Sequence, residues 1–380
     1  MKKIKIALVH DFLIQPGGAE RVLKVLSDMY PEAPIYTLLY DEHKMGEIFK
    51  GREIISSYLQ KFPKFLKKHH RWLLPFYPVI CETFDLREFD LVISSSGAWS
   101  KGIVTKLNTI HISYLHSPMR FAWDYSDQYV KELKGEKLSF ISRFVLNYIR
   151  IWDRLAAERP DYLIANSLYT QRRIEKYYRR DSKIIYPPVS NRNQQSATSN
   201  QEEKVTSYQL PVSDYFLVVS RLSPYKKVDM VVEAFNKLGL PLVVIGQGQQ
   251  EKLLKKIAKD NVTILGWQND EIIQQYYKNA AGFIFPCIDD FGIAPVEAML
   301  SGVPVIAFRK GGACETVQEG ITGEFFDAQT SEVLADGVRR FMLNKDKYDK
   351  EMIKRRAQEF SRERFEREFG EYIENILEVK

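Results

Sequence analysis

The sequence is poor in cysteine and has no long apolar run. Its three cysteines, Cys81, Cys287 and Cys314, stand too far apart for a zinc site or a disulfide framework, so we expect a reducing, cytoplasmic setting. No stretch approaches the roughly 20 apolar residues that a membrane-spanning helix needs. The charged start is followed by too few apolar residues for a signal peptide, and it predicts a first strand instead.

Several common ligand motifs are also missing. There is no G-x-G-x-x-G fingerprint, which argues against a nicotinamide dehydrogenase, and no G-K-[ST] of a P-loop. No D-x-D motif that would hold a diphosphate through a metal stands at a strand end, so we expect neither a metal nor another cofactor. The net charge of +6 is too small for this length to indicate nucleic acid as a partner.

What the sequence does have is a regular alternation of short apolar runs and segments with helical period. In the first half, a helix is predicted at residues 19–29, and strands are predicted at residues 4–9, 35–39, 91–94, 110–115 and 162–165. A tract rich in Asn, Gln, Ser and Thr then precedes a second series, with strands at residues 216–219, 242–245, 262–265, 282–285 and 303–307. This pattern is typical of parallel sheets covered by helices on both faces.

The length of 380 residues indicates two domains. The predicted fold class is therefore α/β, with two doubly wound domains that face a central cleft. We expect a first domain at residues 1–190, a polar linker at 191–212, a second domain at 213–360 and a C-terminal helix at 361–380 that crosses back onto the first domain.

Two carboxylates flank one strand-to-helix turn in the second half. Asp289 follows a predicted buried strand, and Pro295 is expected to open a helix whose first turn carries Glu297. Both would face the crevice above the carboxyl ends of the strands, where open α/β sheets bind ligands. Carboxylates accept hydrogen bonds from hydroxyls, and N–H groups at a helix start bind phosphate, so this turn favours a phosphorylated sugar. Alternatively, the acids only cap the helix.

Two cations follow the first strand of the second half. Arg221 stands at the end of that strand, and Lys226 comes five residues later, just before a helix. At this edge of the sheet the pair would bind a diphosphate, because Arg gives planar multidentate contacts and Lys a point charge. The simpler interpretation is that both are solvated loop residues.

The first half carries weaker signals of the same kind. Gly17 and Gly18 lie between the first strand and the first helix, where glycines let the backbone approach a ligand, although a tight turn would use them too. His116 ends a strand and can hydrogen-bond a sugar hydroxyl or accept a proton. By contrast, His10 and His111 lie within or at the edges of strands, and we expect them to be structural.

Other segments add to these signals. Gly246 and Trp267 follow strand ends of the second half and could border a nucleotide, although a tight turn and edge packing explain them equally well. Residues 61–77 interleave cations with aromatic rings, which favours contact with an anionic membrane surface over a solvated face with core aromatics. The residues expected at that surface, or at the acceptor, are Lys64, Lys67, Lys68, Arg71 and Trp72.

Together these residues resemble the family 4 retaining glycosyltransferases over nearly the whole chain. The resemblance rests on Gly17-Gly18-Ala19-Glu20, His116-Ser117-Pro118, Arg221 with Lys226, residues 289–305, Gly311-Gly312 with Glu315, and Gly320-Ile321-Thr322-Gly323. It implies the GT-B fold, with an N-terminal Rossmann-like domain for the acceptor and a C-terminal one for the nucleotide sugar.

The resemblance also implies roles for the residues of the second half. Arg221 and Lys226 would hold the donor diphosphate and stabilise the departing β-phosphate. Asp289 would contact the hydroxyls of the donor sugar, and Glu297 would bind the ribose. Backbone N–H groups of Phe291 and Gly292 would help Asp289, and Ile293, Gly246 and Trp267 complete the donor-binding set.

In the first half, the resemblance implies that His116 contacts the transferred sugar and that Gly17 and Gly18 approach the diphosphate. Two positions depart from the family pattern. The first acid is usually Glu, and Asp289 is one methylene shorter. The lysine is normally followed by Gly, whereas Lys227 follows Lys226.

Residues 116–124 look most like the GDP-mannose-using mannosyltransferases of bacterial surface-polysaccharide assembly, whose acceptors are polyprenyl-diphosphate-linked sugars. We therefore expect metal-independent, retaining transfer of a hexose, mannose from GDP-mannose, to a lipid-linked or oligosaccharide acceptor. The enzyme would be cytoplasmic and peripheral at the inner face of the cell membrane. The alternatives are a sugar-nucleotide epimerase or hydrolase of the same fold, or a non-catalytic sugar- or membrane-binding module.

Overall fold

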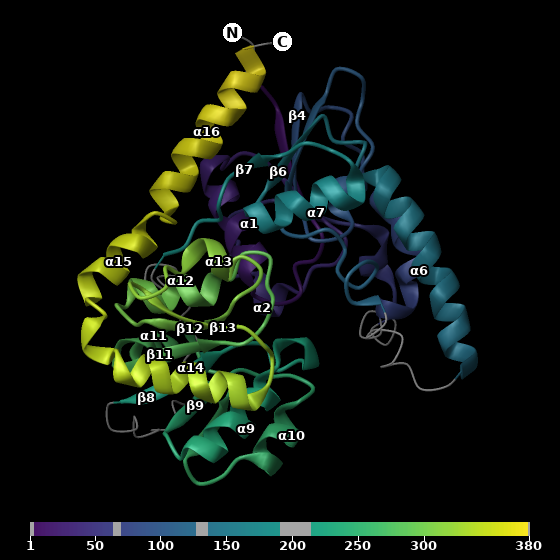
Figure 1. The fold of residues 1–380 in the computed structure, drawn as a ribbon. Helices are drawn as coiled ribbons and strands as arrows, with labels where there is room; N and C mark the ends of the chain where they lie inside the picture. Colours follow the sequence, from purple (N-terminus) through teal and green to yellow (C-terminus); the bar gives the residue numbers. More distant parts are fainter. Residues whose placement is uncertain (1–3, 64–69, 127–135, 191–213, 379–380) are drawn as a thin grey trace. The chain divides into compact units, whose positions relative to one another are not determined.

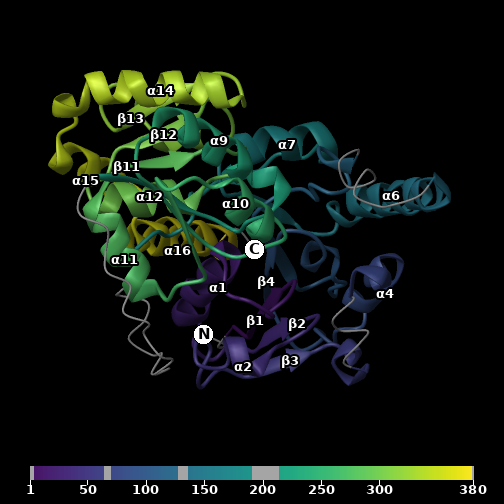
Figure 2. The same cartoon turned by 90° about the horizontal axis from the view of Figure 1, so that it is seen from below.

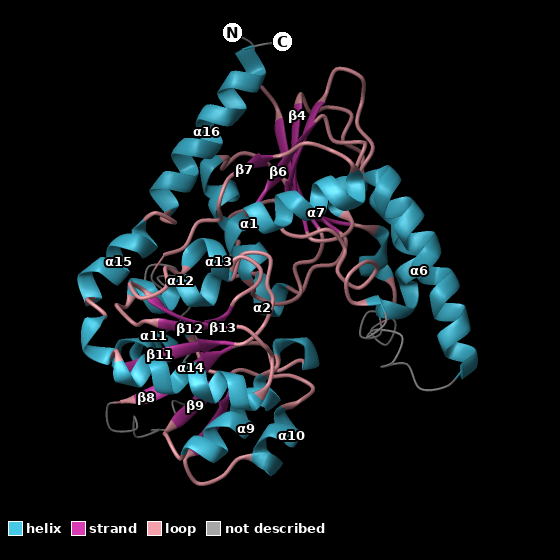
Figure 3. Cartoon of the chain, viewed as in Figure 1, coloured by secondary structure: helices cyan, strands magenta, loops and turns pink. Residues whose placement is uncertain are grey.

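The computed structural model describes residues 4–63, 70–126, 136–190 and 214–378. The chain divides into two compact units, Met1–Tyr186 and Pro187–Lys380. Each unit is built on one parallel sheet with helices packed on it (Figures 1 and 3). The predicted α/β class with two doubly wound sheets is therefore confirmed.

The first unit has a seven-stranded sheet in the order β3-β2-β1-β4-β5-β6-β7, and all neighbouring strands are parallel. Its strands are β1 (Ile6–His10), β2 (Ile35–Thr37), β3 (Ile54–Ser56), β4 (Leu91–Ser96), β5 (Ile110–Leu115), β6 (Tyr162–Ala165) and β7 (Lys183–Ile184). The strand order reverses between β1 and β4. In open α/β sheets, ligands bind outside the carboxyl ends of the strands at such a point.

The helical elements of this unit lie between its strands. They are α1 (Gly18–Met29), α2 (Glu42–Met45), η1 (Tyr58–Lys61), η2 (His70–Phe76), α4 (Tyr77–Cys81), η3 (Ser100–Gly102), α6 (Glu136–Ala156) and α7 (Leu168–Tyr178). Every residue of β4 and β5 is buried, as expected for central strands of a sheet covered on both faces.

The second unit has a six-stranded parallel sheet in the order β10-β9-β8-β11-β12-β13. Its strands are β8 (Tyr215–Val219), β9 (Leu242–Ile245), β10 (Val262–Gly266), β11 (Ala280–Phe285), β12 (Val305–Phe308) and β13 (Gly323–Phe326). Here the order reverses between β8 and β11, so the loops that follow these two strands border the expected ligand crevice.

Helices cover this second sheet, with α9 against α14 and α12 against α11 and α15 (Figure 2). The helical elements are η4 (Pro224–Lys226), α9 (Val228–Leu238), α10 (Glu251–Ile257), α11 (Asp270–Asn279), α12 (Ile293–Leu300), α13 (Ala313–Thr316), α14 (Ser331–Leu343), η5 (Lys345–Lys347), α15 (Lys350–Gln358) and α16 (Arg362–Glu378). None of the helices in the described ranges combines the length and the apolar character that crossing a bilayer requires.

One predicted boundary is wrong in a way that concerns the site. Helix α12 begins at Ile293, two residues before Pro295, so Glu297 lies in its second turn rather than its first. The residue before the helix, Gly292, has φ +88°, and this left-handed conformation lets the chain enter the helix directly. Pro295 is tolerated because the first N–H groups of a helix have no partner within the helix.

Two other expectations stay predictions. Helix α16 occupies most of the predicted C-terminal helix, but its return onto the first domain is not tested. The predicted linker at residues 191–212 lies outside the described residues.

Candidate active site

Lys226 and Asp289 form an ion pair where the strand order of the second unit reverses. Lys226 ends η4, in the loop after β8, and Asp289 lies in the loop after β11, the neighbouring strand. The Lys226 ammonium contacts Asp289 Oδ2, and the two side chains are 14% and 21% exposed. Arg221, two residues after the end of β8, is exposed. The sheet thus places one fixed ion pair and one solvent-facing guanidinium at the expected crevice.

The surroundings of Lys226 keep it charged. Burial by itself lowers the pKa of this ammonium, but the Asp289 carboxylate, with Cys287 and Tyr225 nearby, more than reverses that effect and holds the pKa above its usual range. The ammonium also lies 5.2 Å from the centre of the Tyr225 ring. Lys226 is therefore a permanent, positioned cation at neutral pH.

The turn that carries Asp289 is fixed by two glycines from the loop after β12. The N–H of Gly312 donates to the carbonyl of Asp289 at 3.0 Å. A Cβ on Gly311 would lie 2.4 Å from the Asp289 carbonyl oxygen, and a Cβ on Gly312 would lie 2.3 Å from that of Phe291. Only glycine permits this approach, so Gly311 and Gly312 support the turn.

The start of α12 is fixed by packing as well. Phe291 is buried, with its ring edge-on to Phe360 at 5.4 Å. A Cβ on Gly292 would lie 3.0 Å from the ring of Phe285, and Ile293 is half-buried. Backbone N–H groups at the first turn of α12 are therefore held in place, which suits the binding of an anion.

Glu297 lies on the buried side of α12. Its carboxylate accepts a hydrogen bond from the Tyr277 hydroxyl of α11 at 3.1 Å. This donor fixes the orientation of the carboxylate without neutralising it. The predicted contact of Glu297 with a ribose stays a prediction.

Two other residues of the predicted donor set, Gly246 and Trp267, follow strand ends as predicted. Gly246 has φ +143°, and a Cβ there would lie 1.8 Å from the carbonyl oxygen of Ser220. Close contact between two loops of the protein thus accounts for this glycine without a nucleotide. Trp267 is exposed at the end of β10. Their roles in donor binding stay predictions.

In the first unit, Asp11 shapes the loop at the corresponding reversal of strand order. Its buried carboxylate follows β1 and accepts hydrogen bonds of 2.6–2.8 Å from four successive backbone N–H groups after β4. These belong to Gly97, Ala98, Trp99 and Ser100. Asp11 is not among the residues predicted from the sequence, although an acid directly after a first strand is a usable signal.

His116 is connected to a row of polar side chains at the same edge. Its Nε2 lies 2.7 Å from the Ser95 hydroxyl, which lies 3.1 Å from His10 Nδ1. His10 Nε2 in turn lies 3.7 Å from a Glu20 carboxylate oxygen on α1. His10 is buried, as a structural histidine would be, but it also connects Glu20 to His116. Sequence reasoning named neither Ser95 nor this connection.

The segment that follows His116 is anchored by charged side chains. Arg173 of α7 donates to the Ser117 hydroxyl at 2.8 Å and to the Pro118 carbonyl at 3.2 Å, and it pairs with Asp124. Further along, the Trp123 indole donates to Asp153 of α6 at 2.7 Å. The loop that carries His116 is thus held from two helices.

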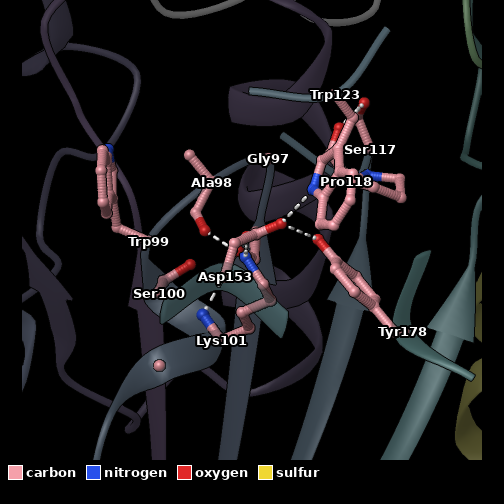
Figure 4. Close-up of polar contacts among 12 residues, drawn as sticks. Gly97, Ala98, Trp99, Ser100, Lys101, Ser117, Pro118, Trp123, Asp153 and Tyr178 are labelled. Carbon is pink, nitrogen blue, oxygen red and sulfur yellow. Dashed lines mark hydrogen bonds and ion pairs between the residues drawn. The ribbon is translucent and has the colours of Figure 1, made fainter. Parts of the chain in front are cut away.

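Asp153 is also half of a fully buried ion pair, shown in Figure 4. The Lys101 ammonium lies 2.5 Å from Asp153 Oδ1 and donates to the Ala98 carbonyl, while the Tyr178 hydroxyl donates to Asp153 Oδ2 at 2.8 Å. The pair ties η3, α6 and α7 together beneath the His116 loop.

The structure shows fewer contacts, or none, for the remaining residues of the predicted site. Gly17 precedes α1 in an extended conformation, and Gly18 is exposed as the first residue of the helix. Lys64, Lys67 and Lys68 lie outside the described residues, and so do the side chains of Arg71 and Trp72 in η2. Within the described ranges, no three His, Cys, Asp or Glu side chains gather as a metal site requires.

Each of the two units matches a known protein family. A family model described as Glycosyltransferase Family 4 matches residues 16–191, and one described as Glycosyl transferases group 1 matches residues 200–359. A GDP-mannose-dependent alpha-(1-6)-phosphatidylinositol monomannoside mannosyltransferase of Mycobacterium tuberculosis is 32% identical over 158 residues, which are 37% of this chain and 41% of the relative. The chain matches less than half of the length of the first curated relatives.

Solved structures resemble the whole chain. HepE of Anabaena in complex with UDP has a TM-score of 0.68 at 18% identity, covering 98% of this chain and 100% of the other. Sucrose-phosphate synthase from Thermosynechococcus elongatus has the same TM-score at 17% identity and the same coverage. At these identities the likeness concerns the fold.

Proposed function

Since the chain belongs to the family 4 glycosyltransferases and has their GT-B fold, we propose that it transfers a hexose from a nucleotide diphosphate to a hydroxyl with retention of configuration. The observation that carries the proposal is the Lys226–Asp289 pair beside the start of α12. It offers a cation for a diphosphate and a carboxylate for sugar hydroxyls, next to the N–H groups at the start of α12 and at one edge of the sheet.

The proposed chemistry is mainly electrostatic. Negative charge grows on the departing diphosphate in the transition state, and a cation already in position stabilises that charge without reorganisation. Lys226 meets this requirement because its neighbours keep it protonated. Arg221, exposed in the same loop, would close on the phosphates when the donor binds.

Asp289 would orient the sugar that is transferred. Its contact with Lys226 couples the two, since a phosphate that engages the ammonium releases part of the carboxylate for hydroxyl groups. N–H groups of Phe291 and Gly292 would assist, and Glu297, oriented by Tyr277, would hold the ribose.

His116 would contact the transferred sugar through Nδ1. The Glu20 carboxylate, 3.7 Å from Nε2 of His10, favours the tautomer with the proton on Nε2, in which Nδ1 of His10 accepts from Ser95. The Ser95 oxygen then accepts from His116 Nε2–H, which leaves the lone pair of His116 on Nδ1. His116 would therefore act as a hydrogen-bond acceptor for a sugar hydroxyl.

For the donor we propose GDP-mannose, and for the acceptor a lipid-linked or oligosaccharide hydroxyl in surface-polysaccharide synthesis. Two observations support the donor: the resemblance at residues 116–124 and the GDP-mannose dependence in the name of the mycobacterial relative. We propose that the first unit binds the acceptor and the second the donor. The enzyme would work in the cytoplasm at the inner face of the membrane, with Lys64, Lys67 and Lys68 near lipid or acceptor.

A thermal-shift screen of nucleotide sugars tests the donor, because a ligand that binds the native state raises the unfolding temperature. We expect a selective shift with GDP-mannose. A selective shift with a different nucleotide sugar would leave the transferase proposal in place and replace the donor.

Incubation of the identified donor without acceptor tests the reaction class. We expect no epimer and little free sugar, and full turnover in EDTA once acceptor is added. Epimer or rapid sugar release would indicate the epimerase or hydrolase, and tight donor binding without turnover on any acceptor would indicate a non-catalytic module. Loss of turnover in EDTA would refute metal independence.

A further inference from the structure

Helix α15 packs against α12, the helix that begins at the candidate active site, and Figures 1 and 2 both show the two helices side by side. We call residues 289–292, which carry Asp289 and lead into α12, the donor turn. Arg356 lies in the last turn of α15, and Phe360 lies two residues after the end of this helix. The two residues support the donor turn by different routes.

Arg356 is connected to the donor turn through α13. Its Nε donates to the Thr316 carbonyl at 3.2 Å, and its Nη2 donates to the Glu315 carbonyl. These are the last two carbonyls of α13, and the last carbonyls of a helix have no partner within it. The Thr316 N–H donates to the Gly312 carbonyl at 3.2 Å, and the Gly312 N–H donates to Asp289. Three consecutive hydrogen bonds thus lead from Arg356 to Asp289.

The guanidinium of Arg356 is itself fixed. Its third nitrogen, Nη1, lies 2.5 Å from a Glu359 carboxylate oxygen, and its carbon lies 5.2 Å from the centre of the Phe360 ring. The Arg356 side chain is 20% exposed. Each nitrogen of the planar fork therefore has a partner, and a fork held in this way is preorganised to keep the end of α13 in place.

Phe360 supports the donor turn directly. Its buried ring lies edge-on to the buried ring of Phe291, with 5.4 Å between the centres. The main chain of Phe360 is held on both sides, because its N–H donates to the Ala357 carbonyl at 3.0 Å and its carbonyl accepts from the Val189 N–H at 2.8 Å. The ring of Phe360 therefore cannot shift without breaking these bonds or opening a cavity. Its position determines where the chain of Phe291 enters α12.

We propose that Arg356 and Phe360 are positioning residues for the transfer reaction. Arg356 acts through Gly312 on the carboxylate of Asp289, and Phe360 acts through Phe291 on the N–H groups at the start of α12. Because the two lie four residues apart, one segment of chain sets both groups relative to each other. A displacement of about 1 Å at reacting groups costs up to about hundredfold in rate. The inference rests on the proposed function, since it places these residues behind the donor site.

Amide hydrogen exchange tests the positioning in the full chain without any sugar. In Arg356→Met, exchange at residues 311–317 should be at least about tenfold faster than in the wild type, because the last carbonyls of α13 lose a charged donor. Arg356→Lys keeps the charge but replaces only part of the planar fork, so its exchange rates should lie between the two. Arg355→Met removes an exposed arginine from the same turn of α15 and should exchange like the wild type.

Single-turnover rates, measured with the donor that the thermal-shift screen identifies, test the link to the reaction. Arg356→Met and Phe360→Leu should slow the chemical step about tenfold to hundredfold and change the donor Kd less than about threefold. Phe341→Leu is the matched control, because it makes the same change at a buried phenylalanine of α14. Both leucine variants should unfold at a lower temperature, but only Phe360→Leu should be slower in the folded protein. Phe360→Met replaces Phe360→Leu if the latter is not folded at the assay temperature.

Three results would overturn the proposal. They are exchange in Arg356→Met that matches Arg355→Met, faster exchange without a slower chemical step, and a rate loss in Phe341→Leu equal to that in Phe360→Leu. The last would reduce the role of Phe360 to general packing. A wild type that transfers no sugar would refute the proposed function instead, and the exchange rates would still decide whether Arg356 holds the donor turn.

Discussion

Replacing Lys101 with Met should strongly destabilise the first unit. Lys101 and Asp153 are both fully buried, with 2.5 Å between nitrogen and oxygen. Without the ammonium, Asp153 keeps its hydrogen bonds from Trp123 and Tyr178 but remains a buried, uncompensated charge. Breaking such a pair from one side costs about 3–5 kcal/mol. At about 2–4 °C per kcal/mol for a unit of this size, the unfolding temperature should fall by about 6–20 °C.

The double variant Lys101→Met/Asp153→Asn separates charge from packing. Asn retains an oxygen to accept from Trp123 and Tyr178, and its amide can donate to the Ala98 carbonyl that Lys101 leaves. It should therefore recover most of the lost stability in differential scanning calorimetry, with the second unit as internal reference. The reasoning is refuted if Lys101→Met unfolds within about 2 °C of the wild type, or if the double variant is no more stable than the single one.

Three further predictions concern single residues. Lys227 has φ +55°, a backbone conformation that favours glycine, and the family normally has Gly at this position. Lys227→Gly should therefore stabilise the second unit by up to about 1 kcal/mol in thermal unfolding. A loss of stability would show that the lysine side chain offsets the strain. Burial lowers the pKa of His111 to about 3, so the unfolded chain takes up this proton first as pH falls. Stability should be constant above about pH 6.5 and decline by about 1.4 kcal/mol per unit from there to about pH 3, and an equally steep slope in His111→Gln would contradict this assignment. Ser95→Ala should change the imidazole ¹⁵N shifts of His116 and slow turnover about tenfold to hundredfold, whereas unchanged shifts would remove Ser95 from the tautomer argument.

The main strands and helices could be predicted because local patterns determine them. Residues 110–115 and 242–245 form β5 and β9 over the predicted ranges, since each has an unbroken pattern of strand length between clear breaks. The edge strands β3 and β7 were missed. They have three and two residues and are not fully buried, so neither produces an apolar run.

The meeting of Lys226 and Asp289 also follows from topology, because the loops after β8 and β11 share one edge once the strand order reverses there. The interactions of Asp11 could not be predicted in this way. Its four N–H partners lie 86 to 89 residues away, in a loop without a motif of its own. Only the packed structure brings them together.

The exposed side of α6 could not be predicted from the helical period of its apolar residues. The helix is apolar on two sides, and the sequence does not say which side is the core. The membrane contact predicted at residues 61–77 stays a prediction, and the exposed apolar side chains of α6 are recognisable only in the folded unit.

The most direct test of the central claim compares Lys226→Ala with its neighbour Lys227→Ala. Both remove one lysine from the same turn, but only Lys226 pairs with Asp289. Single-turnover rates and donor Kd values should show that Lys226→Ala slows the chemical step about 10²–10³-fold, weakens donor binding less than about tenfold, and that Lys227→Ala matches the wild type. Equal losses in rate and binding, or a Lys226→Ala variant as fast as its control, would contradict the account.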